Sequence, residues 1–509
     1  MSAAPGVANV PPEALEAART ALAQTMGLGA SLVAAGMPLC HLHDAHGARA
    51  VDVRIVRDHD AFHSAVRGAL PGIAPEQVDA LWQPVRQAPA LQLAYEVLFV
   101  RALDALQGLL TYPDDVLFDG AERAILAQAD AARKSETRAI WLGGARPHAV
   151  TGIVKITRLC NLRCSYCHDW RTGPGANMAF GVRAAAVDWL LRGSQAQTVK
   201  IVLHGGEPTL VGERGLLVLL ALAARARQPR QRISVCMQTN ATRLGEGMRA
   251  ILRRFGIVAS VSMDGPPEVH DRTRKDVKGR VTSDAVRRNT RALKADGTLG
   301  GVLMVVTPAL IDAGAARLVD FMLEDGLDHV GLLPMRPAAG APVDGAGCLP
   351  LARYCDFLLE IEALRRERAP WLQVRELDAM LAALAHDTPR TCELQGQCVG
   401  NYFAIEPDGS VSHCDKYLGD PRYVIGRVDQ PFGDIVAGPA IDTLRRGAAA
   451  AKERKAGCSW WTRCKGWCPH EDYVARSAGQ APQCCGLAPL LAGLAALPAR
   501  EPERGEHAA

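Results

Sequence analysis

The amino-acid sequence predicts an α/β fold in which a parallel sheet with crossover helices is curled or closed into a barrel. From Thr151 onward, six short runs of β-branched and apolar residues alternate with segments of helical composition. The preceding 148 residues are rich in Ala and Leu and contain a single cysteine, whereas eight cysteines gather between Cys392 and Cys485. We therefore expect a mostly helical N-terminal region, a β/α barrel and a cysteine-rich C-terminal domain.

Composition excludes several classes of protein. The 58 Lys and Arg residues nearly balance the 54 Asp and Glu residues, and a net charge of +4 over 509 residues does not predict nucleic acid or a membrane surface as partner. Small residues and prolines follow Met1, so no secretory signal is expected. The longest apolar run, Leu216–Ala224, is far shorter than the roughly 20 residues of a membrane helix. Fifteen cysteines then indicate metal or redox chemistry in a reducing cytoplasm.

The N-terminal region, residues 1–148, is expected to be mostly helical. Leu91–Leu110 and Ala121–Lys134 space their apolar residues at helical intervals. One short alternating run, Ala50–Val56, is compatible with a strand, and the histidine-rich stretch 41–46 fits a solvated loop better than a metal site. Nothing in this region indicates a catalytic site, although a region of this size is able to bind a substrate, a leader peptide or a partner.

The barrel is expected within residues 149–335. Its six strand-like runs are Gly152–Ile156, Val199–Leu203, Ile233–Met237, Val258–Met263, Val302–Val306 and His329–Leu333. Segments of helical composition between them include Val182–Leu191, Leu216–Ala226, Met248–Phe255 and Ala285–Ala295. In such architectures the reactive groups lie at the carboxyl ends of the strands. The candidate site residues directly follow these runs.

The chain beyond the barrel divides into three parts. Residues 336–390 are expected to hold a Gly/Pro/Ala-rich linker and helices, among them Leu351–Arg368. Residues 391–490 form the cysteine-rich domain. The charged tail, residues 491–509, is expected to be frayed.

Three cysteines follow the first strand in the spacing C-x3-C-x2-C, at Cys160, Cys164 and Cys167. Three thiolates on one loop can hold three corners of a cubane iron–sulfur cluster and leave the fourth iron open to a small molecule. A structural zinc site favours two C-x2-C pairs and four ligands, and the fourth ligand is absent here. The spacing therefore favours a cluster with one open iron.

This triplet, with an aromatic residue, Tyr166, before its third cysteine and a strand before its first, resembles the radical S-adenosylmethionine (SAM) superfamily. The resemblance implies a partial (β/α)6 TIM-like barrel that carries a [4Fe–4S] cluster at the SAM site. In that family the open iron chelates SAM, and a 5′-deoxyadenosyl radical then removes a hydrogen atom from the substrate. All-thiolate ligation in a dry pocket suits the low potential that this chemistry needs.

Further motifs resemble the SAM-binding elements of this family. The second strand ends in His-Gly-Gly-Glu-Pro, and the family assigns such glycines and the carboxylate to the SAM amine, here Gly205, Gly206 and Glu207. The third strand ends in polar residues that include Asn240. The fourth strand resembles the sulfatase-maturase branch, which implies that Ser262 and Arg274 contact the ribose and the carboxylate of SAM. The sequence does not separate Arg274 from Arg272, since both lie on one basic loop.

The C-terminal cysteines resemble the SPASM extension of radical SAM enzymes. A Pro-Asp-Gly turn at 407–409 predicts a hairpin that brings Cys398 and Cys414 onto adjacent strands. The resemblance implies one or two auxiliary [4Fe–4S] clusters. One takes Cys392, Cys398, Cys414 and Cys468, and the other takes Cys458, Cys464 and one of Cys484 or Cys485. Structural zinc sites without a redox role are the alternative for this field.

Lys455 stands where the family pattern has a further cysteine, three residues before Cys458. Three explanations follow: both Cys484 and Cys485 contribute, a non-cysteine group ligates, or the second cluster keeps an open iron. Adjacent cysteines rarely reach one cluster without backbone strain, which favours the last two.

Hydrogen abstraction leaves a radical that must lose another electron, and often a proton, before a stable bond forms. Asp415, next to a cluster ligand, is a candidate base for that proton. A turn cap or an ion pair with Lys416 is the alternative for this residue. By resemblance, we predict a radical SAM/SPASM maturase that acts on a ribosomally made peptide or protein and forms an oxidative crosslink, through C–C or thioether bonds. The resemblance also implies an external electron donor of the flavodoxin or ferredoxin type.

Two features favour the crosslinking enzyme: the large N-terminal region and the departure at Lys455. The alternative within the family is an anaerobic sulfatase maturase that generates formylglycine. An electron-transfer protein with several clusters is the alternative of another class. It explains the cysteines but not the motifs at Gly205–Glu207 and at Ser262–Arg274.

Overall fold

The computed structural model describes residues 59–69, 73–86, 102–135, 147–167, 176–337, 348–386, 391–395, 398–417 and 419–497. Its core is one ten-stranded sheet in the order β10-β9-β8-β1-β2-β3-β4-β5-β6-β7. The strands are β1 (Ala149–Thr157), β2 (Thr198–Gly205), β3 (Arg232–Thr239), β4 (Val258–Ser262), β5 (Leu299–Val306), β6 (His329–Pro334), β7 (Gln373–Val374), β8 (Tyr402–Ile405), β9 (Ser410–His413) and β10 (Val424–Arg427).

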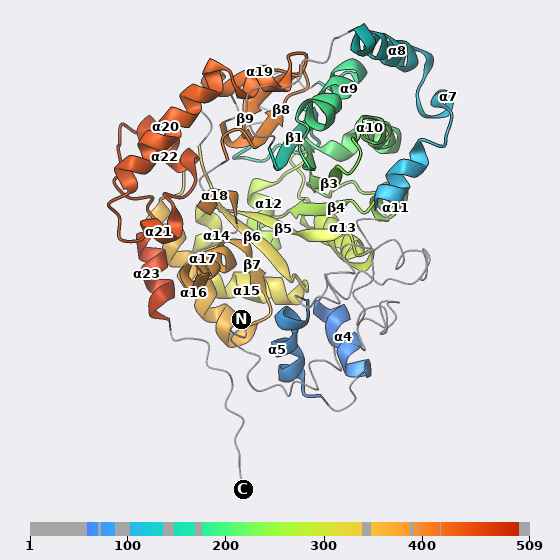
Figure 1. Ribbon diagram of the computed structural model, residues 1–509. Coiled ribbons are helices and arrows are strands. Elements are labelled where there is room, and N and C mark those ends of the chain that lie inside the picture. The colour runs from blue at the N-terminus through green and yellow to red at the C-terminus, as the bar shows by residue number, and fades with distance from the viewer. Residues whose placement is uncertain are drawn as a thin grey trace, which may run out of the picture.

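Strands β1 to β7 are parallel, and helices connect most of them on the outer face (Figure 1). The barrel helices are α9 (Phe180–Asp188), α10 (Gly212–Ala226), α11 (Glu246–Arg254), α12 (Pro267–Thr273), α13 (Ser283–Ala295), α14 (Pro308–Ala313) and α15 (Ala315–Glu324). The six predicted strands and the four predicted helices are all present. The sheet has two ends, at β10 and β7, so the α/β fold is a partial barrel, as expected.

The cysteine-rich part continues the barrel sheet. Strand β8 pairs in parallel with β1, where Val154 lies opposite Ile405, and β9 and β10 then follow in antiparallel order. The predicted hairpin is therefore present, but Cys398 precedes β8 and Cys414 follows β9, so both lie just beyond the strands. The C-terminal helices are α16 (Leu351–Arg368), α17 (Arg375–His386), α18 (Cys392–Gln395), α19 (Phe432–Val436), α20 (Pro439–Lys455), α21 (Trp461–Cys464), α22 (Pro469–Ser477) and α23 (Ala488–Ala496).

The expectation of a frayed tail from residue 491 is wrong for its first part. Helix α23 continues to Ala496, because Leu491 and Leu494 are buried and the helix packs against α16. Residues 498–509 lie outside the described part of the chain.

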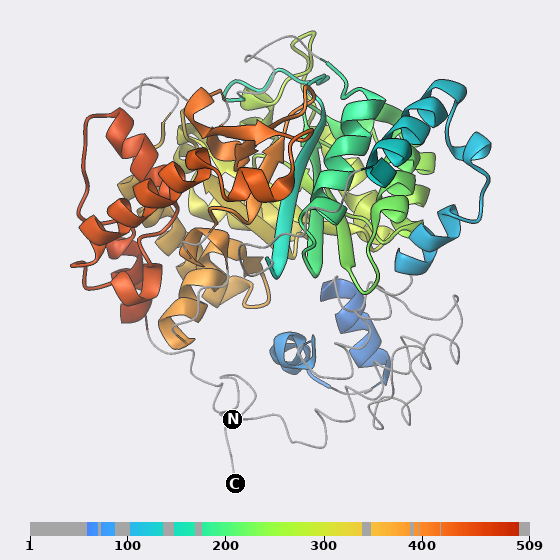
Figure 2. The same cartoon turned by 45° about the horizontal axis from the view of Figure 1, so that its top comes forward.

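The described N-terminal residues are helical. Helices α4 (His59–Ala69) and α5 (Pro75–Arg86) lie beneath the sheet, and α7 (Asp114–Leu117) and α8 (Gly120–Ser135) lie beside α10 (Figure 2). Helix α8 confirms the prediction for Ala121–Lys134, and residues 102–109 are helical within the predicted Leu91–Leu110. The predicted strand Ala50–Val56 and the histidine-rich stretch 41–46 lie outside the described residues. No helix in the described ranges is long and apolar enough to cross a lipid bilayer.

The N-terminal helices contact the barrel away from the carboxyl ends of its strands. In α4, His59 stacks on Trp371 with ring centroids 4.7 Å apart, and its backbone N–H donates to Asp328 at 2.8 Å. Trp371 and Asp328 precede β7 and β6, so this contact lies at the amino ends of the strands. On the outer face, Arg214 of α10 pairs with Glu122 of α8 at 2.6 Å. Helix α10 is apolar on nearly all sides because it packs against α9, α11 and α7.

Candidate active site

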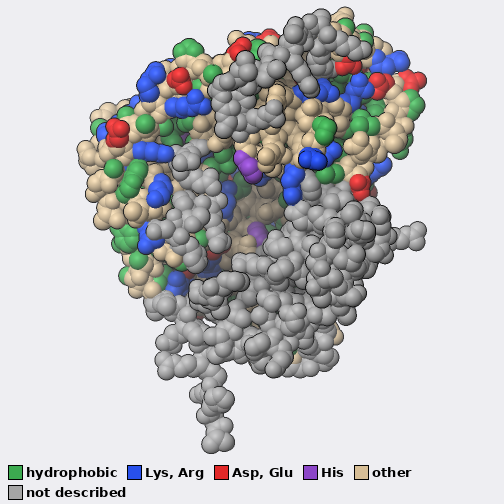
Figure 3. Space-filling view, in the orientation of Figure 1, with side chains coloured by type: hydrophobic (Ala, Val, Ile, Leu, Met, Phe, Trp, Pro, Cys, Tyr) green, Lys and Arg blue, Asp and Glu red, His purple; other side chains and the backbone are tan. Residues whose placement is uncertain are grey.

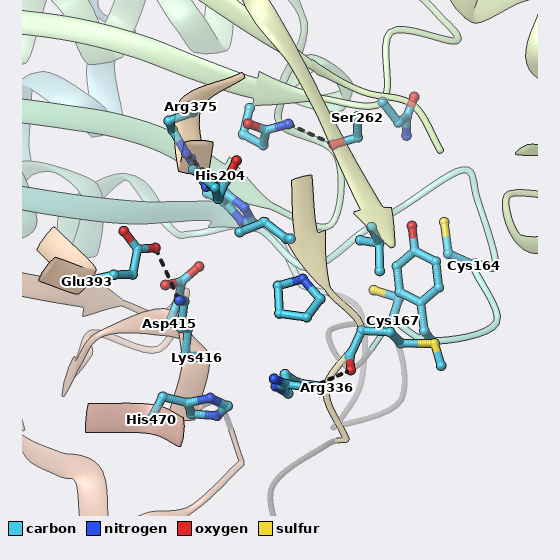
Figure 4. Close-up of a pocket in the computed structure, with 18 of the residues that line it drawn as sticks. Cys164, Cys167, His204, Ser262, Arg336, Arg375, Glu393, Asp415, Lys416 and His470 are labelled. Atoms are coloured by element: carbon cyan, nitrogen blue, oxygen red, sulfur yellow. Dashed lines mark hydrogen bonds and ion pairs between the residues drawn. The ribbon is translucent and has the colours of Figure 1, made fainter. Parts of the chain in front are cut away.

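A cavity of about 370 Å³ opens where the carboxyl ends of the strands meet the cysteine-rich domain. Figure 3 shows a hollow on this face, with histidine side chains inside it and basic side chains around it. Figure 4 shows Asp415, Lys416 and Glu393 on one side of the cavity and Cys164 and Cys167 on the other. Eleven residues predicted from the sequence line this one cavity: Cys160, Cys164, Tyr166, Cys167, Gly205, Gly206, Glu207, Asn240, Ser262, Arg274 and Asp415.

The loop of the first three cysteines is held by backbone hydrogen bonds to the segment that follows α12. Arg163 N–H donates to Lys275 C=O at 2.8 Å, and Ser165 N–H donates to Thr273 C=O at 2.9 Å. Within the loop, the amide of Leu162 donates to the sulfur of Cys160 at 3.4 Å. The loop is therefore shaped by the protein itself and presents its thiols to the cavity.

Burial keeps the thiols of Cys160 and Cys164 protonated unless a metal binds. It raises the pKa of Cys160 to about 12 and that of Cys164 to about 11. Bound iron supplies the positive charge that makes thiolates stable at such a site. Among the described residues, no three His, Cys, Asp or Glu side chains gather tightly enough for a single metal ion. The ligands of a cubane bind four different irons and so stand farther apart, and the arrangement therefore gives no support to a mononuclear zinc site.

The two glycines after β2 allow its end to lie against the end of β1. A Cβ atom on Gly205 would lie 2.0 Å from the C=O oxygen of Thr157, and one on Gly206 would lie 2.2 Å from that of Leu159. Gly205 also has φ +130°, which side chains rarely allow. The close approach that these glycines permit is therefore to the chain that enters the cysteine loop, in addition to any ligand.

Glu207 is a buried carboxylate held by four donors. Its Oε1 accepts from Thr239 Oγ1 at 2.7 Å and from both the amide and the hydroxyl of Thr209, at 3.1 and 2.7 Å. Its Oε2 accepts from the Asn240 amide at 2.7 Å and retains a lone pair. Burial raises the pKa of Glu207, and the donated hydrogen bonds oppose that rise. A cation in the cavity would complete the site.

Arg274 and Tyr166 converge on Asp264, a residue that sequence reasoning missed. Arg274 Nε lies 3.0 Å from Asp264 Oδ2, and the Tyr166 hydroxyl donates to the same oxygen at 2.6 Å. Burial opposes the charge of Arg274, but Asp264 outweighs it and the pKa of the guanidinium is raised. Arg274 Nη1 also reaches Cys164 Sγ, at 3.9 Å. Arg272 is exposed, which separates the two arginines that the sequence left equivalent.

Asn240 and Ser262 join neighbouring elements at the cavity wall. The Asn240 side-chain amide donates to Asn161 Oδ1 at 3.0 Å and approaches Cys160 Sγ at 3.8 Å, so it ties β3 to the cysteine loop. The Ser262 hydroxyl accepts from Gln238 at 2.7 Å. Both side chains therefore lie where a small molecule bound at the cysteine loop would extend along the sheet.

The first auxiliary set of cysteines lies beside the cavity. Cys392, Cys398 and Cys414 each interact electrostatically with Cys468, so the structure brings the four together. Lys416 Nζ donates toward Cys468 Sγ at 3.7 Å and pairs with Glu393 at 3.3 Å. A cationic side chain thus lies next to the thiols, which favours thiolate ligands.

The second set also comes together. Cys458 Sγ lies 3.7 Å from Cys484 Sγ, and Cys464 Sγ lies 3.5 Å from Cys485 Sγ. Both adjacent cysteines therefore face this set, although the sequence favoured a contribution from only one.

Asp415 is a carboxylate surrounded by positive charge. Burial disfavours its ionisation, but His204, Lys155 and Lys416 outweigh that effect and hold the pKa of Asp415 below its usual range. Its Oδ1 accepts from the Cys414 thiol at 3.5 Å. The alternative role for Asp415 was an ion pair with Lys416. In the structure the Lys416 amine pairs with Glu393 instead. Asp415 is therefore ionised at neutral pH and faces both the cavity and the first auxiliary set.

Sequence reasoning did not single out several residues that line or adjoin the cavity. Lys155 lies within β1, where it pairs with Glu406 at 3.3 Å, and His204 ends β2 with a buried Nδ1 that has no hydrogen-bond partner in the described part of the chain. Arg336, which follows β6, forms a bidentate pair with Glu471 of α22 at 2.8 to 3.0 Å. Strand-end position is the only cue that marks His204 and Arg336. Lys155 could be identified as a cavity residue only from the folded sheet.

Two family models match this chain. Residues 154–322 match the radical SAM superfamily, and residues 392–466 match the SPASM iron–sulfur cluster-binding domain. The cavity described above lies between these two segments and is lined by both.

Among curated relatives, the cysteine-type anaerobic sulfatase-maturating enzyme of Clostridium perfringens (strain ATCC 13124) is 26% identical over 329 residues, which is 61% of this chain and 85% of the relative. The serine-type enzyme of Klebsiella aerogenes is 25% identical over 315 residues, 61% of this chain and 77% of the relative. The solved structure of native anSMEcpe with bound AdoMet has a TM-score of 0.60 and 22% identity, over 68% of this chain and 98% of that one. The structural match shows a shared fold, and almost a third of this chain lies outside it.

Proposed function

This chain belongs to the radical SAM superfamily, in its SPASM branch, and from that premise we propose that it oxidises a side chain of a peptide or protein held in the cavity. The observation that carries the proposal is Asp415. Its ionised carboxylate lies in the same cavity as the first three cysteines and accepts from Cys414 of the auxiliary set. An oxidation that begins at one cluster and ends at another needs a base at such a place.

The cofactors of this chain are SAM and [4Fe–4S] clusters. The residues fit them: three thiols on one preshaped loop leave a fourth ligand position to SAM, and Glu207 Oε2 keeps a lone pair for an ammonium. Bound there, the cluster and SAM supply the one-electron chemistry that removes a hydrogen atom from the substrate. We assign Glu207, Gly205 and Gly206 to the amine of SAM. Asn240, Ser262, Arg274 and Tyr166 complete the wall around it.

Asp415 acts after the hydrogen atom has left. The substrate radical then loses one proton and one electron, which completes a two-electron oxidation. Asp415 takes the proton, and Cys414 and Cys468 would hold the auxiliary cluster that accepts the electron. Lys155, Lys416 and His204 keep Asp415 ionised until that point, because they favour its negative charge.

The product that this arrangement supports best is an aldehyde made from a Cys or Ser side chain, as in formylglycine. Relatives of both the cysteine and the serine type match over more than three quarters of their length. For Ser, loss of two electrons and two protons gives the aldehyde directly; for Cys it gives a thioaldehyde, which water converts to the aldehyde with release of hydrogen sulfide. Either oxidation needs one substrate side chain and one base, and Asp415 is the base that the cavity supplies.

Crosslinking of two side chains is the second candidate, and the part of the chain outside the match favours it. It removes the same two electrons, with a second side chain as the group that attacks. Among the described residues, none from 59–135 lines the cavity. If the described N-terminal helices bind a leader peptide, they therefore do so away from the cavity.

The experiment uses anaerobically reconstituted protein, SAM and a reductant with peptides that carry a single Cys or Ser deuterated at its β-carbon. We expect deuterium in the 5′-deoxyadenosine and an aldehyde that a hydrazide probe traps. A peptide that loses two hydrogens, gains no aldehyde and shows a crosslink by tandem mass spectrometry would establish the second candidate instead. If no 5′-deoxyadenosine formed, the enzyme proposal would fail, and the alternative of an electron-transfer protein with several clusters would stand.

An external electron donor of the flavodoxin or ferredoxin type fits the rim beside the first cysteine loop. Segment 275–281 bonds to that loop through Arg163 and Asn161 and exposes Lys275, Lys278 and Arg280. Leu159, Val277 and Val281 are exposed there as well. An apolar patch with basic neighbours suits an acidic redox protein. The cytoplasmic location stays a prediction.

A further inference from the structure

The adjacent cysteines Cys484 and Cys485 each face a different cysteine around α21. Cys484 lies 3.7 Å from Cys458 and Cys485 lies 3.5 Å from Cys464, sulfur to sulfur. Cys464 and Cys485 are buried, and the other two are half-buried. The match to the SPASM domain ends at residue 466, so it assigns neither member of the adjacent pair. The two contacts place four thiols in one neighbourhood, as two hydrogen-bonded pairs whose sulfur atoms must separate for each to bind a different iron of a cubane.

All four sulfur atoms accept a hydrogen bond from the backbone amide two residues further along the chain. The donors are Trp460 for Cys458, Gly466 for Cys464 at 3.4 Å, Gly486 for Cys484 at 3.4 Å and Leu487 for Cys485. The same arrangement occurs at Cys160, where Leu162 donates at 3.4 Å. Amide donation to sulfur stabilises a thiolate and tunes iron–sulfur centres, so each of the four is prepared as a ligand.

The backbone directly after the pair takes a left-handed conformation that side chains rarely adopt. Gly486 has φ +86°, and a Cβ atom there would lie 2.3 Å from Cδ2 of Leu351. We expected backbone strain where two adjacent cysteines face one group. Here the residue that takes the left-handed conformation is a glycine, which adopts it at little cost. Gly466, after Cys464, has φ +82° and plays the same part on the other side.

Lys455 is not available as a substitute ligand. Its side chain is buried and its Nζ lies 3.3 Å from Oδ1 of Asp472. Arg454 and Arg476 contact the same carboxylate at 2.9 Å. An ammonium group in such an ion pair has no lone pair to donate to iron. The residue at the position of the missing cysteine therefore has a structural role.

We propose that Cys484 and Cys485 both ligate the second auxiliary iron–sulfur cluster, together with Cys458 and Cys464. The pair supplies the thiolate that Lys455 does not, so four cysteines close the cluster. A closed cluster has no iron for a substrate atom, and its task is to pass electrons. This inference rests on the SPASM assignment and not on which product the enzyme makes.

The test replaces each adjacent cysteine separately, as Cys484→Ala and Cys485→Ala, in the full chain reconstituted anaerobically. Cys236→Ala, in β3, is the matched control. With SAM in excess to occupy the first cluster, we measure iron per chain and the EPR spectrum of the reduced protein with and without cyanide. Each variant should either lose about four irons or show an auxiliary signal that cyanide shifts. The unsubstituted protein and the control should show neither effect, and Lys455→Cys should add no iron.

The proposal fails if one of the two variants keeps the iron content and the cyanide-insensitive spectrum of the unsubstituted protein, since only one cysteine would then ligate. A cyanide-sensitive auxiliary signal in the unsubstituted protein, or zinc in place of four irons, also overturns it. Should the variants not fold, alkylation of the unsubstituted holoprotein decides. Both cysteines should resist iodoacetamide and react once iron is removed, and modification of either in the holoprotein contradicts the proposal.

Discussion

Glu207 and Asp415 are two carboxylates of one cavity, and their surroundings shift the pKa of each in opposite directions. Glu207 is surrounded by neutral donors, and burial raises its pKa. Asp415 is also enclosed, but three basic side chains outweigh burial and lower its pKa. The two carboxylates therefore differ in what controls their charge: burial dominates at Glu207 and neighbouring basic groups dominate at Asp415. The local sequence places Glu207 in the Gly-Gly-Glu-Pro motif and Asp415 directly after a cysteine. It does not show that Asp415 has basic neighbours, because these come from β1, from β2 and from the next residue in the chain.

Replacement of Glu207 by Gln should weaken SAM binding by about 10- to 100-fold, since a hydrogen bond to a charged group contributes about 1.5–3 kcal/mol. The shape and most of the four donated bonds remain. Equilibrium binding of SAM to the reconstituted protein measures the change. Glu213→Gln, an exposed carboxylate on α10, is the control. Equal SAM affinity in both variants would remove Glu207 from the SAM site.

Replacement of Asp415 by Asn should separate the first half of the reaction from the second. The variant keeps the outline of the side chain but loses basicity, which is typically worth about 10² to 10⁴ in rate. We expect 5′-deoxyadenosine to form while little modified peptide appears, so their ratio rises steeply. If both fall together, Asp415 positions the substrate or the cluster instead.

The lowered pKa of Asp415 also fixes the sign of its pH dependence. The carboxylate is available at any pH above its ordinary range and is lost only in more acidic solution. The ratio of 5′-deoxyadenosine to product in the unsubstituted enzyme should therefore stay constant between about pH 6 and 8. A rise of that ratio on acidification within this interval would mean that another group is the base.

The elements of the barrel were predictable because each strand is a short apolar run and each helix repeats its apolar residues at helical intervals. β7 was not, since it has two residues, and neither was the parallel pairing of β8 with β1, which joins residues about 250 positions apart. Helix α23 was missed because Leu491 and Leu494 gain stability only against α16. The site residues at strand ends followed from the fold class. The roles of Lys155 and Asp264 did not follow, because they depend on which partners the folded chain brings to them.

The docking of α4 depends on pH through His59. Burial lowers its pKa, but Asp60, Asp79 and Asp328 outweigh this effect and raise it from 6.5 to about 9. Protonated His59 therefore stabilises the contact in full below about pH 6.5, and this stabilisation is lost as pH rises through about 9. His59→Phe keeps a ring on Trp371 but removes the charge. It should speed hydrogen exchange in residues 59–69 most at low pH, relative to the unsubstituted protein at the same pH.

His63→Phe, on the same helix, is the control for this prediction, because its Nε2 lies 4.0 Å from Asp79 and its pairing is weaker. Equal exchange in the His59→Phe and unsubstituted proteins at pH 6 would contradict a charged His59 at this contact.

The molecule as a whole places the cavity, and with it the proposed chemistry, between the barrel and the C-terminal domain. Arg336 and Glu471 bridge the two parts beside the cavity, and β8 joins the C-terminal hairpin to the barrel sheet. The two halves of the proposed reaction thus lie on facing walls of one cavity, and α4 contacts the barrel at the opposite, amino ends of the strands.

Charge at the rim should control delivery of electrons but not the chemistry that follows. Lys275→Glu combined with Lys278→Glu should raise the KM for a reduced flavodoxin several-fold, because an acidic partner loses its basic contacts. Turnover with dithionite, which needs no docking, should be unchanged. Arg446→Glu, exposed on α20, is the control. A double variant as active with flavodoxin as the unsubstituted enzyme would move the donor site elsewhere.

The most direct measurement of the central claim is the yield of 5′-deoxyadenosine from a variant in which Cys160, Cys164 and Cys167 are all replaced by Ala. The main hydrophobic core does not include Cys160, Cys164 or Cys167, so the protein should fold and retain the iron of the auxiliary sites, with about four irons fewer per chain than the unsubstituted enzyme. We expect SAM to remain uncleaved under reducing conditions in which the unsubstituted enzyme cleaves it. Cleavage of SAM by the triple variant would contradict the assignment of the cavity as the active site.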